Sequence, residues 1–330
     1  MRTRFAALCC LLSVSTLALT GCVAGLTYDR STAAQPASFL FTMADVSVSP
    51  VTGVTSSYPA GSTGASVAAT SSASVTSGYL GYGIRGDGKG NIYALGYSSG
   101  GSLSVNVYST ANGVLTLTRS FTYGAFPQTL AADPTGIVYV STGSAILKFA
   151  ANATGAATPT IIAPTSAFTP MATDSAGDLY AYAGSGVVDE FNAGFTTGTP
   201  SKVLTLSAIG STAISSVSDM AIDSSGNIYL AGFATGPTPF ISEYSSATGT
   251  TTPTKTISGS STLMADPVAL AVDNAGNIYE EDAPIFTVSA HNNIIYTFSA
   301  GASGNVAPSG NFSPAAQTVA PATFVGLVAY

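Results

Sequence analysis

The densest group of side chains that could do chemistry is an acidic run near the end of the chain. Glu280, Glu281 and Asp282 are adjacent, and His291, the one histidine of the sequence, follows them. Carboxylates suit Ca²⁺ or Mg²⁺, and together with a histidine they can transfer protons. Successive residues of a strand point to opposite faces, so Glu281 would oppose its two neighbours if a strand continues through them. We keep all four residues as candidate metal ligands, but favour a solvated acidic loop.

Aspartates also recur at regular intervals along the chain. One motif appears five times: Asp-x-x-Gly, followed two residues later by an apolar residue and then Tyr. The Asp-to-Asp steps are 46, 41, 49 and 50 residues. Periods of roughly 20–50 residues mark solenoids and propellers. The carboxylate can bind turn N–H groups and the glycine tolerates a positive φ, so the sequence predicts structural hairpin turns rather than metal sites. The paired positions are Asp87 and Gly90, Asp133 and Gly136, Asp174 and Gly177, Asp223 and Gly226, and Asp273 and Gly276.

Each repeat reads as four short strands. A small residue stands two positions before the Asp in four of five repeats, the Tyr follows in a second strand, and a third carries an apolar residue three before an aromatic one. A Thr-rich or Pro-rich stretch such as 254–257 supplies the fourth. Four antiparallel strands per repeat describe a propeller blade, with the small residues nearest the central axis.

The two ends of the chain complete a further blade. Residues 39–43, 46–49 and 53–57 are expected as its second to fourth strands, and 324–330 as its first, whereas 59–79 are expected as a surface loop. Joining both ends in one blade removes open sheet edges. The sequence therefore predicts an all-β, six-bladed propeller that forms a single domain over residues 38–330.

The repeats resemble NHL-type propeller repeats of exported bacterial proteins over roughly residues 80–300. The resemblance specifies a fold more than a function, since propellers host enzymes as well as binding domains. Gluconolactonase relatives hold a channel metal with acidic and amide side chains from several blades, and streptogramin lyases use His and Glu with magnesium. Asp189, Glu190 and Glu243 are expected on third strands facing solvent, which leaves no acidic set converging on a channel.

The N-terminus has the features of an export signal. Arg2 and Arg4 precede an apolar stretch from Phe5 to Leu19, too short to span a membrane, and small residues follow. The ending Leu-Thr-Gly-Cys resembles a bacterial lipobox, which implies cleavage after residue 21 and a lipid on Cys22. Residues 22–37 would be a polar tether. Val23 in place of Asp resembles the pattern sorted to the outer membrane where the host has one.

The charge and the cysteine content limit the classes of partner that the protein could bind. Removal of Arg2 and Arg4 leaves seven Lys and Arg against 16 Asp and Glu, a formal charge of −9, and no Cys follows Cys22. Nucleic acid is disfavoured because phosphate binding needs clustered cations. We expect a monomeric, lipid-anchored binding or scaffolding module for a protein or glycan, without cofactor; the alternative is a metal-dependent lactonase or lyase.

Overall fold

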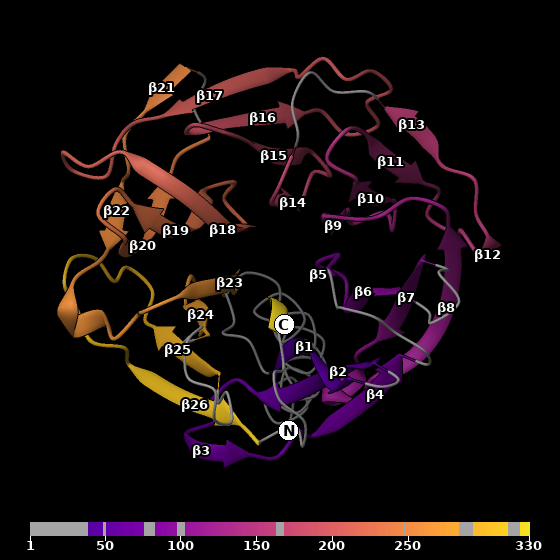
Figure 1. Cartoon of the computed structure of the whole chain (residues 1–330), viewed down its shortest axis with the longest axis horizontal. Helices are drawn as coiled ribbons and strands as arrows, with labels where there is room; N and C mark the ends of the chain where they lie inside the picture. Colours follow the sequence, from indigo (N-terminus) through magenta and orange to yellow (C-terminus); the bar gives the residue numbers. More distant parts are fainter. Residues whose placement is uncertain are drawn as a thin grey trace, which may run out of the picture. The chain divides into compact units, whose positions relative to one another are not determined.

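The computed structural model describes residues 39–48, 51–75, 83–97, 103–162, 168–246, 249–283, 293–315 and 324–330. Cys22, the tether and His291 lie outside these ranges. Six antiparallel sheets are arranged as blades around a centre, as Figure 1 shows. The prediction of an all-β, six-bladed propeller is confirmed. No helix among the described residues has the length and apolarity needed to cross a membrane.

The sheets follow the order of the chain around the ring. Blade 1 contains β27 (Phe324–Ala329), β1 (Phe39–Val48), β2 (Val51–Pro59) and β4 (Ser71–Val75). Blade 2 contains β5 (Ile84–Gly86), β6 (Asn91–Tyr97), β7 (Leu103–Ser109) and β8 (Thr116–Tyr123). Blade 3 contains β9 (Thr129–Ala132), β10 (Val138–Ser141), β11 (Ile146–Phe149) and β13 (Thr160–Ile162).

The remaining three blades repeat the pattern. Blade 4 contains β14 (Met171–Thr173), β15 (Leu179–Gly184), β16 (Val187–Phe191) and β17 (Lys202–Leu206). Blade 5 contains β18 (Ile214–Ile222), β19 (Ile228–Ala234), β20 (Thr238–Tyr244) and β22 (Lys255–Ile257). Blade 6 contains β23 (Pro267–Val272), β24 (Ile278–Asp282), β25 (Ile294–Phe298) and β26 (Gly310–Pro314).

The connections between third and fourth strands tie neighbouring blades together. Three of them contribute short strands that pair in parallel with the outer strand of the preceding blade: β3 (Gly64–Val67) with β26, β12 (Gly155–Ala156) with β8, and β21 (Gly249–Thr251) with β17. The same connection in blade 2 forms the 3₁₀ helix η1 (Ala111–Gly113), and its Gly113 carbonyl accepts a hydrogen bond from Ser57 of blade 1. A second 3₁₀ helix, η2 (Ser260–Thr262), precedes β23. These connections between third and fourth strands cover outer edges that would otherwise be open for pairing.

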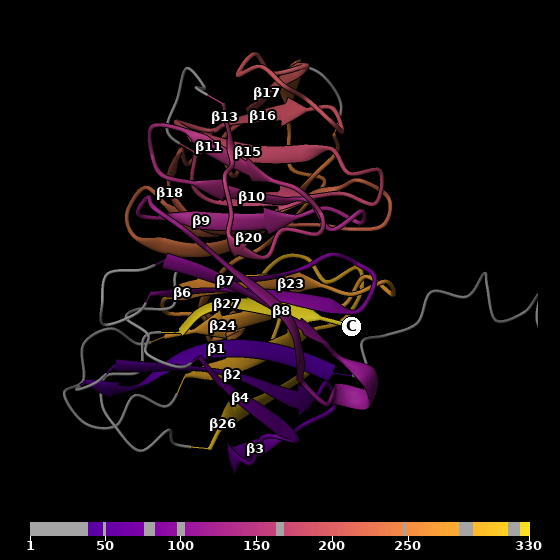
Figure 2. The ribbon, with the colours of Figure 1, turned by 90° about the vertical axis from the view of Figure 1, so that its right-hand side faces the viewer.

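The ring closes through the two ends of the chain. β1 pairs antiparallel with β27, which lies beside it in the side view of Figure 2. The backbone N–H groups of Phe39 and Tyr330 donate to each other's carbonyl oxygens at 2.9 and 3.0 Å.

Two details of the predicted blade were wrong. Residues 39–43 and 46–48 belong to one strand, β1, and 53–57 fall in the third strand, β2. Residue 49 lies outside the described ranges. The fourth strand, β4, lies within 59–79, where a loop was expected, because Ser and Thr side chains suffice for an outer, exposed strand.

Apolar side chains fill the spaces between blades. Phe121 of blade 2 and Phe149 of blade 3 lie 4.9 Å apart between ring centroids, in one cluster with Tyr93 and Leu130. Tyr139, also of blade 3, belongs to the cluster shared with blade 4. The two aromatic positions of one repeat therefore face opposite neighbours, so that each blade packs on both sides.

Candidate functional site

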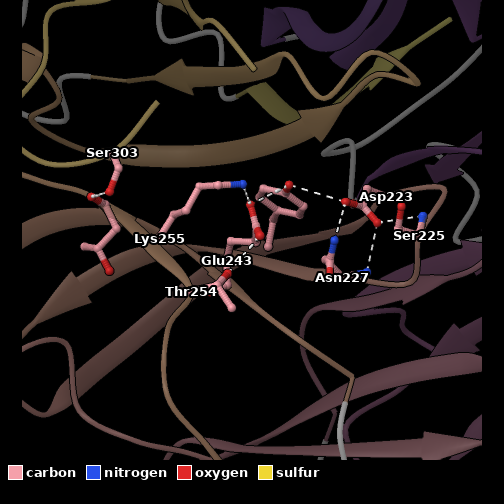
Figure 3. A network of polar contacts seen from close by, with 9 residues as sticks. Asp223, Ser225, Asn227, Glu243, Thr254, Lys255 and Ser303 are labelled. Carbon is pink, nitrogen blue, oxygen red and sulfur yellow. Dashed lines mark hydrogen bonds and ion pairs between the residues drawn. The ribbon is translucent and has the colours of Figure 1, made fainter. Parts of the chain in front are cut away.

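The Asp-Gly turns use the aspartate as a hydrogen-bond acceptor for the turn itself. In the turn between β18 and β19, Asp223 Oδ1 accepts the backbone N–H groups of Ser225 at 2.8 Å and Asn227 at 2.9 Å. Its Oδ2 accepts from Asn227 Nδ2 at 2.8 Å and from the Tyr229 hydroxyl at 3.4 Å, as Figure 3 shows. Gly226 has φ of +80°, the left-handed region that glycine adopts without a Cβ penalty.

The other four turns share this arrangement with local variation. Asp87 and Asp273 make the same four kinds of contact, including bonds from Tyr93 at 3.3 Å and Tyr279 at 3.0 Å. In the Asp133 turn, Ile137 stands at the position of the Asn, so no amide side chain can donate to the carboxylate. Asp133 instead accepts a hydrogen bond from the Thr135 hydroxyl at 2.6 Å. Asp174 receives the two backbone bonds. The spacing of the repeat phrase thus matches the reach of one carboxylate over its own turn.

Two glutamates of third strands, Glu243 and Glu190, lie beside turn tyrosines. Glu243 of β20 accepts hydrogen bonds from the Tyr229 hydroxyl at 2.8 Å and from Thr254 Oγ1 at 2.8 Å, and pairs with Lys255 Nζ at 2.6 Å (Figure 3). Burial raises the pKa of the Glu243 carboxyl, but these donors outweigh it and hold the pKa below its usual range. In blade 4, Glu190 pairs with Lys202 Nζ at 2.7 Å.

The expectation that acids of the third strands face solvent is wrong. Asp189, Glu190 and Glu243 are all buried. Glu190 and Glu243 can be accommodated because a lysine is placed beside each, and the Tyr229 hydroxyl also donates to Glu243. Periodicity alone could not show this, since both faces of a propeller blade are covered.

The first strands of the six blades surround a central cavity of about 240 Å³. It is lined by the ends of those strands that lead into the Asp-Gly turns, together with Leu327, Val328 and Tyr330. The four small residues expected near the axis line it, as predicted: Ala131, Ala172, Ala221 and Ala271. In the first repeat the equivalent position is Arg85, which also lines the cavity.

Arg85 crosses the centre of the ring. From β5 of blade 2 its guanidinium forms an ion pair with Asp219 of β18, in the blade opposite, and its Nε donates to the Met171 carbonyl of blade 4 at 3.3 Å. Asp219 also accepts the backbone N–H of Met220 at 2.8 Å and of Leu270, in blade 6, at 2.9 Å. One largely buried ion pair therefore connects the first strands of four blades across the centre of the ring.

The acidic run at 280–282 is not a solvated loop. It forms the end of β24, with Glu280 and Glu281 fully buried and Asp282 nearly so. Cross-strand neighbours pack all three, which overturns the expectation of a solvated loop. The predicted alternation does hold, because Glu281 lies on the side of blade 6 that packs against blade 1, and the other two acids face blade 5.

Glu281 shares its side of the blade with Asn293, whose Nδ2 donates to Glu281 Oε1 at 2.9 Å. Burial raises the pKa of the Glu281 carboxyl to about 8; the bond from Asn293 opposes this rise, and the charge of Asp219 adds to it. Glu281 Oε2 has no partner among the described residues. Glu281 is therefore held as a neutral acid near neutral pH, next to the channel ion pair.

Glu280, Asp282 and Asp266 form a separate group of three acids. Asp282 Oδ2 accepts the backbone N–H groups of Ala265 at 2.6 Å and Asp266 at 3.0 Å. Burial first, and then the neighbouring carboxylates, raises the pKa of Glu280 well above its usual range, and its two oxygens have no partner among the described residues. Within the described ranges, no three His, Cys, Asp or Glu side chains are arranged to hold a metal ion. His291 lies outside those ranges, so its predicted place beside the acids is not described.

Arg85, Asp219, Asn293 and Asp266 were missed as site residues from the sequence. A signal existed for Arg85, since it replaces the small residue that precedes the Asp by two positions in the other four repeats. Asp219 is likewise a charged residue four positions before its turn aspartate, Asp223, and no other repeat has a charged residue at that position. A charged residue on the most crowded strand requires a partner, but only the closed ring brings blades 2 and 5 within reach of one side chain.

Comparison with known proteins shows the fold and no family. No protein-family model and no curated protein matches the sequence. Among solved structures, a chain of a nidogen–laminin complex is 13% identical, with a TM-score of 0.55 and coverage of 88% of this chain and 97% of that one. A Bacteroides fragilis protein described as a "putative 6-phosphogluconolactonase" is 13% identical, with a TM-score of 0.49 and coverage of 87% and 98%. Identities this low show a shared propeller fold alone.

Proposed function

We propose that this protein is an NHL-type propeller, anchored by a lipid on Cys22 at the bacterial cell envelope, that acts as a non-catalytic binding or scaffolding module for a protein or a glycan. The observation that carries the non-catalytic part is the Arg85–Asp219 ion pair across the channel. In gluconolactonase relatives, which share the propeller fold, side chains from several blades surround a metal in the channel. Here a permanently charged guanidinium occupies it, and repulsion between like charges disfavours a divalent cation there.

The alternative is a metal-dependent lactonase or lyase, and one observation favours it. Glu280 is buried with two oxygens that have no partner among the described residues, beside Asp282 and Asp266. The raised pKa keeps Glu280 protonated when no cation is present, and a bound cation would instead stabilise its ionised form. This alternative places the metal in blade 6 and not in the channel.

Equilibrium dialysis and turnover assays separate the two functions. The purified protein that begins at Cys22 is dialysed against Ca²⁺, Mg²⁺ or Zn²⁺ and then assayed with lactone and ester substrates. The binding module predicts neither uptake nor turnover. Metal uptake with turnover that is lost in Glu280→Gln and Glu281→Gln, but kept in the blade 4 control Glu190→Gln, would establish the enzyme.

The lipid anchor is tested by feeding a bacterial host an alkyne-tagged fatty acid and isolating the protein. Label should be incorporated into the natural chain and into Cys9→Ser, which alters only the leader, but not into Cys22→Ser. Labelling that persists in Cys22→Ser contradicts the anchor.

Binding is tested separately by cross-linking the lipid-free domain to envelope fractions and purified cell-wall glycan. Saturable binding to a defined protein or glycan supports the proposal. Failure to bind either class contradicts it.

A further inference from the structure

The two ends of the propeller meet where a sixth Asp-Gly turn would stand. In blades 2 to 6 such a turn joins the first strand to the second. In blade 1 the first strand is β27, which ends at Ala329, and the second is β1, which begins at Phe39. The mutual backbone bonds of Phe39 and Tyr330 take the place of the turn. The chain therefore enters the propeller on the face formed by the five Asp-Gly turns, which we call the turn face.

Tyr330 fixes this point of entry to the neighbouring turn. Its hydroxyl accepts the backbone N–H of Gly88 at 3.0 Å and donates to the Asn91 carbonyl at 2.9 Å. Tyr330 also lines the central cavity. Phe39, at the start of β1, is thus bound through its backbone to a residue that lines the cavity, on the inner side of blade 1 rather than at its outer strand.

The turn face displays little of the protein's negative charge. The five turn aspartates are buried or half-buried, with their carboxylates engaged by their own turns. The exposed tips carry a single charged residue, the cation Lys89; the others are Gly88, Thr135, Ser175, Ala176, Ser224, Ser225 and Asn274. The third turn also contains the half-buried Asp178, whose carboxylate accepts the backbone N–H of Ala193 at 2.6 Å. Connections between third and fourth strands flank the tips. Four of them contain no charged residue: residues 110–115, 150–159, 192–201 and 299–309. A formal charge of −9 therefore does not produce an acidic surface here, and an anionic bilayer would not repel this face strongly.

We propose that the turn face is the surface directed toward the lipid bilayer, and that the connections between fourth and first strands, where Phe126 and Leu263 are exposed, point away from it. This inference rests on the proposed lipid on Cys22. A random coil of 16 residues, the length of the expected tether, has a root-mean-square length of about 22 Å and spans at most about 55 Å when extended. Because the tether joins the turn face near its axis, turning the opposite face to the membrane would require the tether to reach around the ring.

Energy transfer can test the orientation, because the chain contains no tryptophan. Ala176→Trp places one on the turn face, and Phe126→Trp places one on the opposite face at a position that is already aromatic and 61% exposed. The protein that begins at Cys22 has no other thiol and can be coupled through it to a maleimide lipid in phosphatidylcholine vesicles that contain a dansyl lipid. Because the tether is short, transfer from Ala176→Trp should exceed that from Phe126→Trp by about twofold or more.

A reversed attachment serves as the control. In the Cys22→Ser background, coupling through Leu263→Cys should invert the order of the two transfers; melting curves confirm that each variant is folded. Equal transfer from both tryptophans with the Cys22 linkage, or greater transfer from Phe126→Trp, would overturn the proposed orientation. Chemical coupling makes this result independent of lipidation in cells. A chain that orients as expected but takes up no fatty acid in the labelling experiment would refute the anchor and leave the geometry intact.

Discussion

Glu281 is a buried acid whose charge state depends on pH within the range in which proteins are handled. Its pKa is raised to about 8 chiefly by burial. A raised pKa in the folded state stabilises the protein fully below the unfolded value, near 4.5, and this contribution is lost as the pH rises through about 8. The protein should therefore become less stable on the alkaline side, in contrast to proteins whose buried acids are ion-paired.

Glu281→Gln removes this dependence. The variant should be more stable than the natural protein at pH 9, by on the order of 1–3 kcal/mol, and nearly equal to it at about pH 4. Thermal denaturation followed across pH measures the difference. Glu243→Gln is the matched control with the opposite sign: the pKa of Glu243 is lowered, so that this variant should be destabilised near neutral pH and the loss should shrink in acid. A Glu281→Gln difference that does not change with pH contradicts the assignment.

The channel ion pair yields a prediction about coupling. Arg85→Met leaves Asp219 charged and buried, and Asp219→Asn leaves the guanidinium without its counter-ion, so each should cost about 3–5 kcal/mol of unfolding free energy. The double variant should lose much less than the sum, because no isolated charge remains. Urea denaturation of the four proteins completes the cycle. Additive losses would show that the two side chains do not act as a pair.

At the scale of a single element, the hairpin turn depends on backbone conformation as much as on the aspartate. Gly226 has φ of +80°, and a Cβ added to it would lie 3.7 Å from Ser246 Oγ, an ordinary contact distance, so space is not the constraint. Strain in the backbone is the constraint, since β-branched residues are outliers at positive φ.

Gly226→Val should therefore destabilise the protein by about 1–3 kcal/mol. Gly124→Val is the matched control: Gly124 is exposed, lacks a positive φ and has no atom within 4 Å of a Cβ, so that its substitution should cost less than about 0.5 kcal/mol. The comparison is made by melting temperature and, once a ligand is known, by affinity. Equal losses in the two variants, or a loss of binding without a loss of stability in Gly226→Val, would contradict a structural role for the turn.

The whole ring depends on one pairing between the ends of the chain. Deleting residues 324–330 removes the first strand of blade 1 and uncovers β1, with Leu40 and Phe41 no longer packed on both sides. An exposed inner edge invites pairing with other chains. The shortened protein should aggregate or elute as multimers, as measured by size-exclusion chromatography with light scattering.

Tyr330→Phe is the control for this deletion. It keeps β27 and loses the hydroxyl contacts to Gly88, Asn91 and Asp87, at a cost of about 1 kcal/mol, and should remain monomeric. A monomeric, cooperatively folding deletion variant would show that closure by the C-terminal strand is dispensable.

The sequence by itself determined the repeat, the four strands of blades 2 to 6, the number of blades and the joining of the two ends, but not the strand boundaries of blade 1. These features are local or periodic: the reach of one Asp carboxylate spans one turn, and the alternation of side chains follows from the strand. Even the alternation of Glu280 and Glu281 could be predicted in this way.

Only the tertiary structure decided which acids are buried and what they contact. Blade faces are covered by neighbouring blades, so Glu190, Glu243 and the acids of β24 are enclosed although their sequence looks like that of a solvated strand. The Arg85–Asp219 pair joins residues far apart in the chain that meet because six blades close into a ring. Closure is a property of the whole molecule, and it also decides that the chain enters on the turn face.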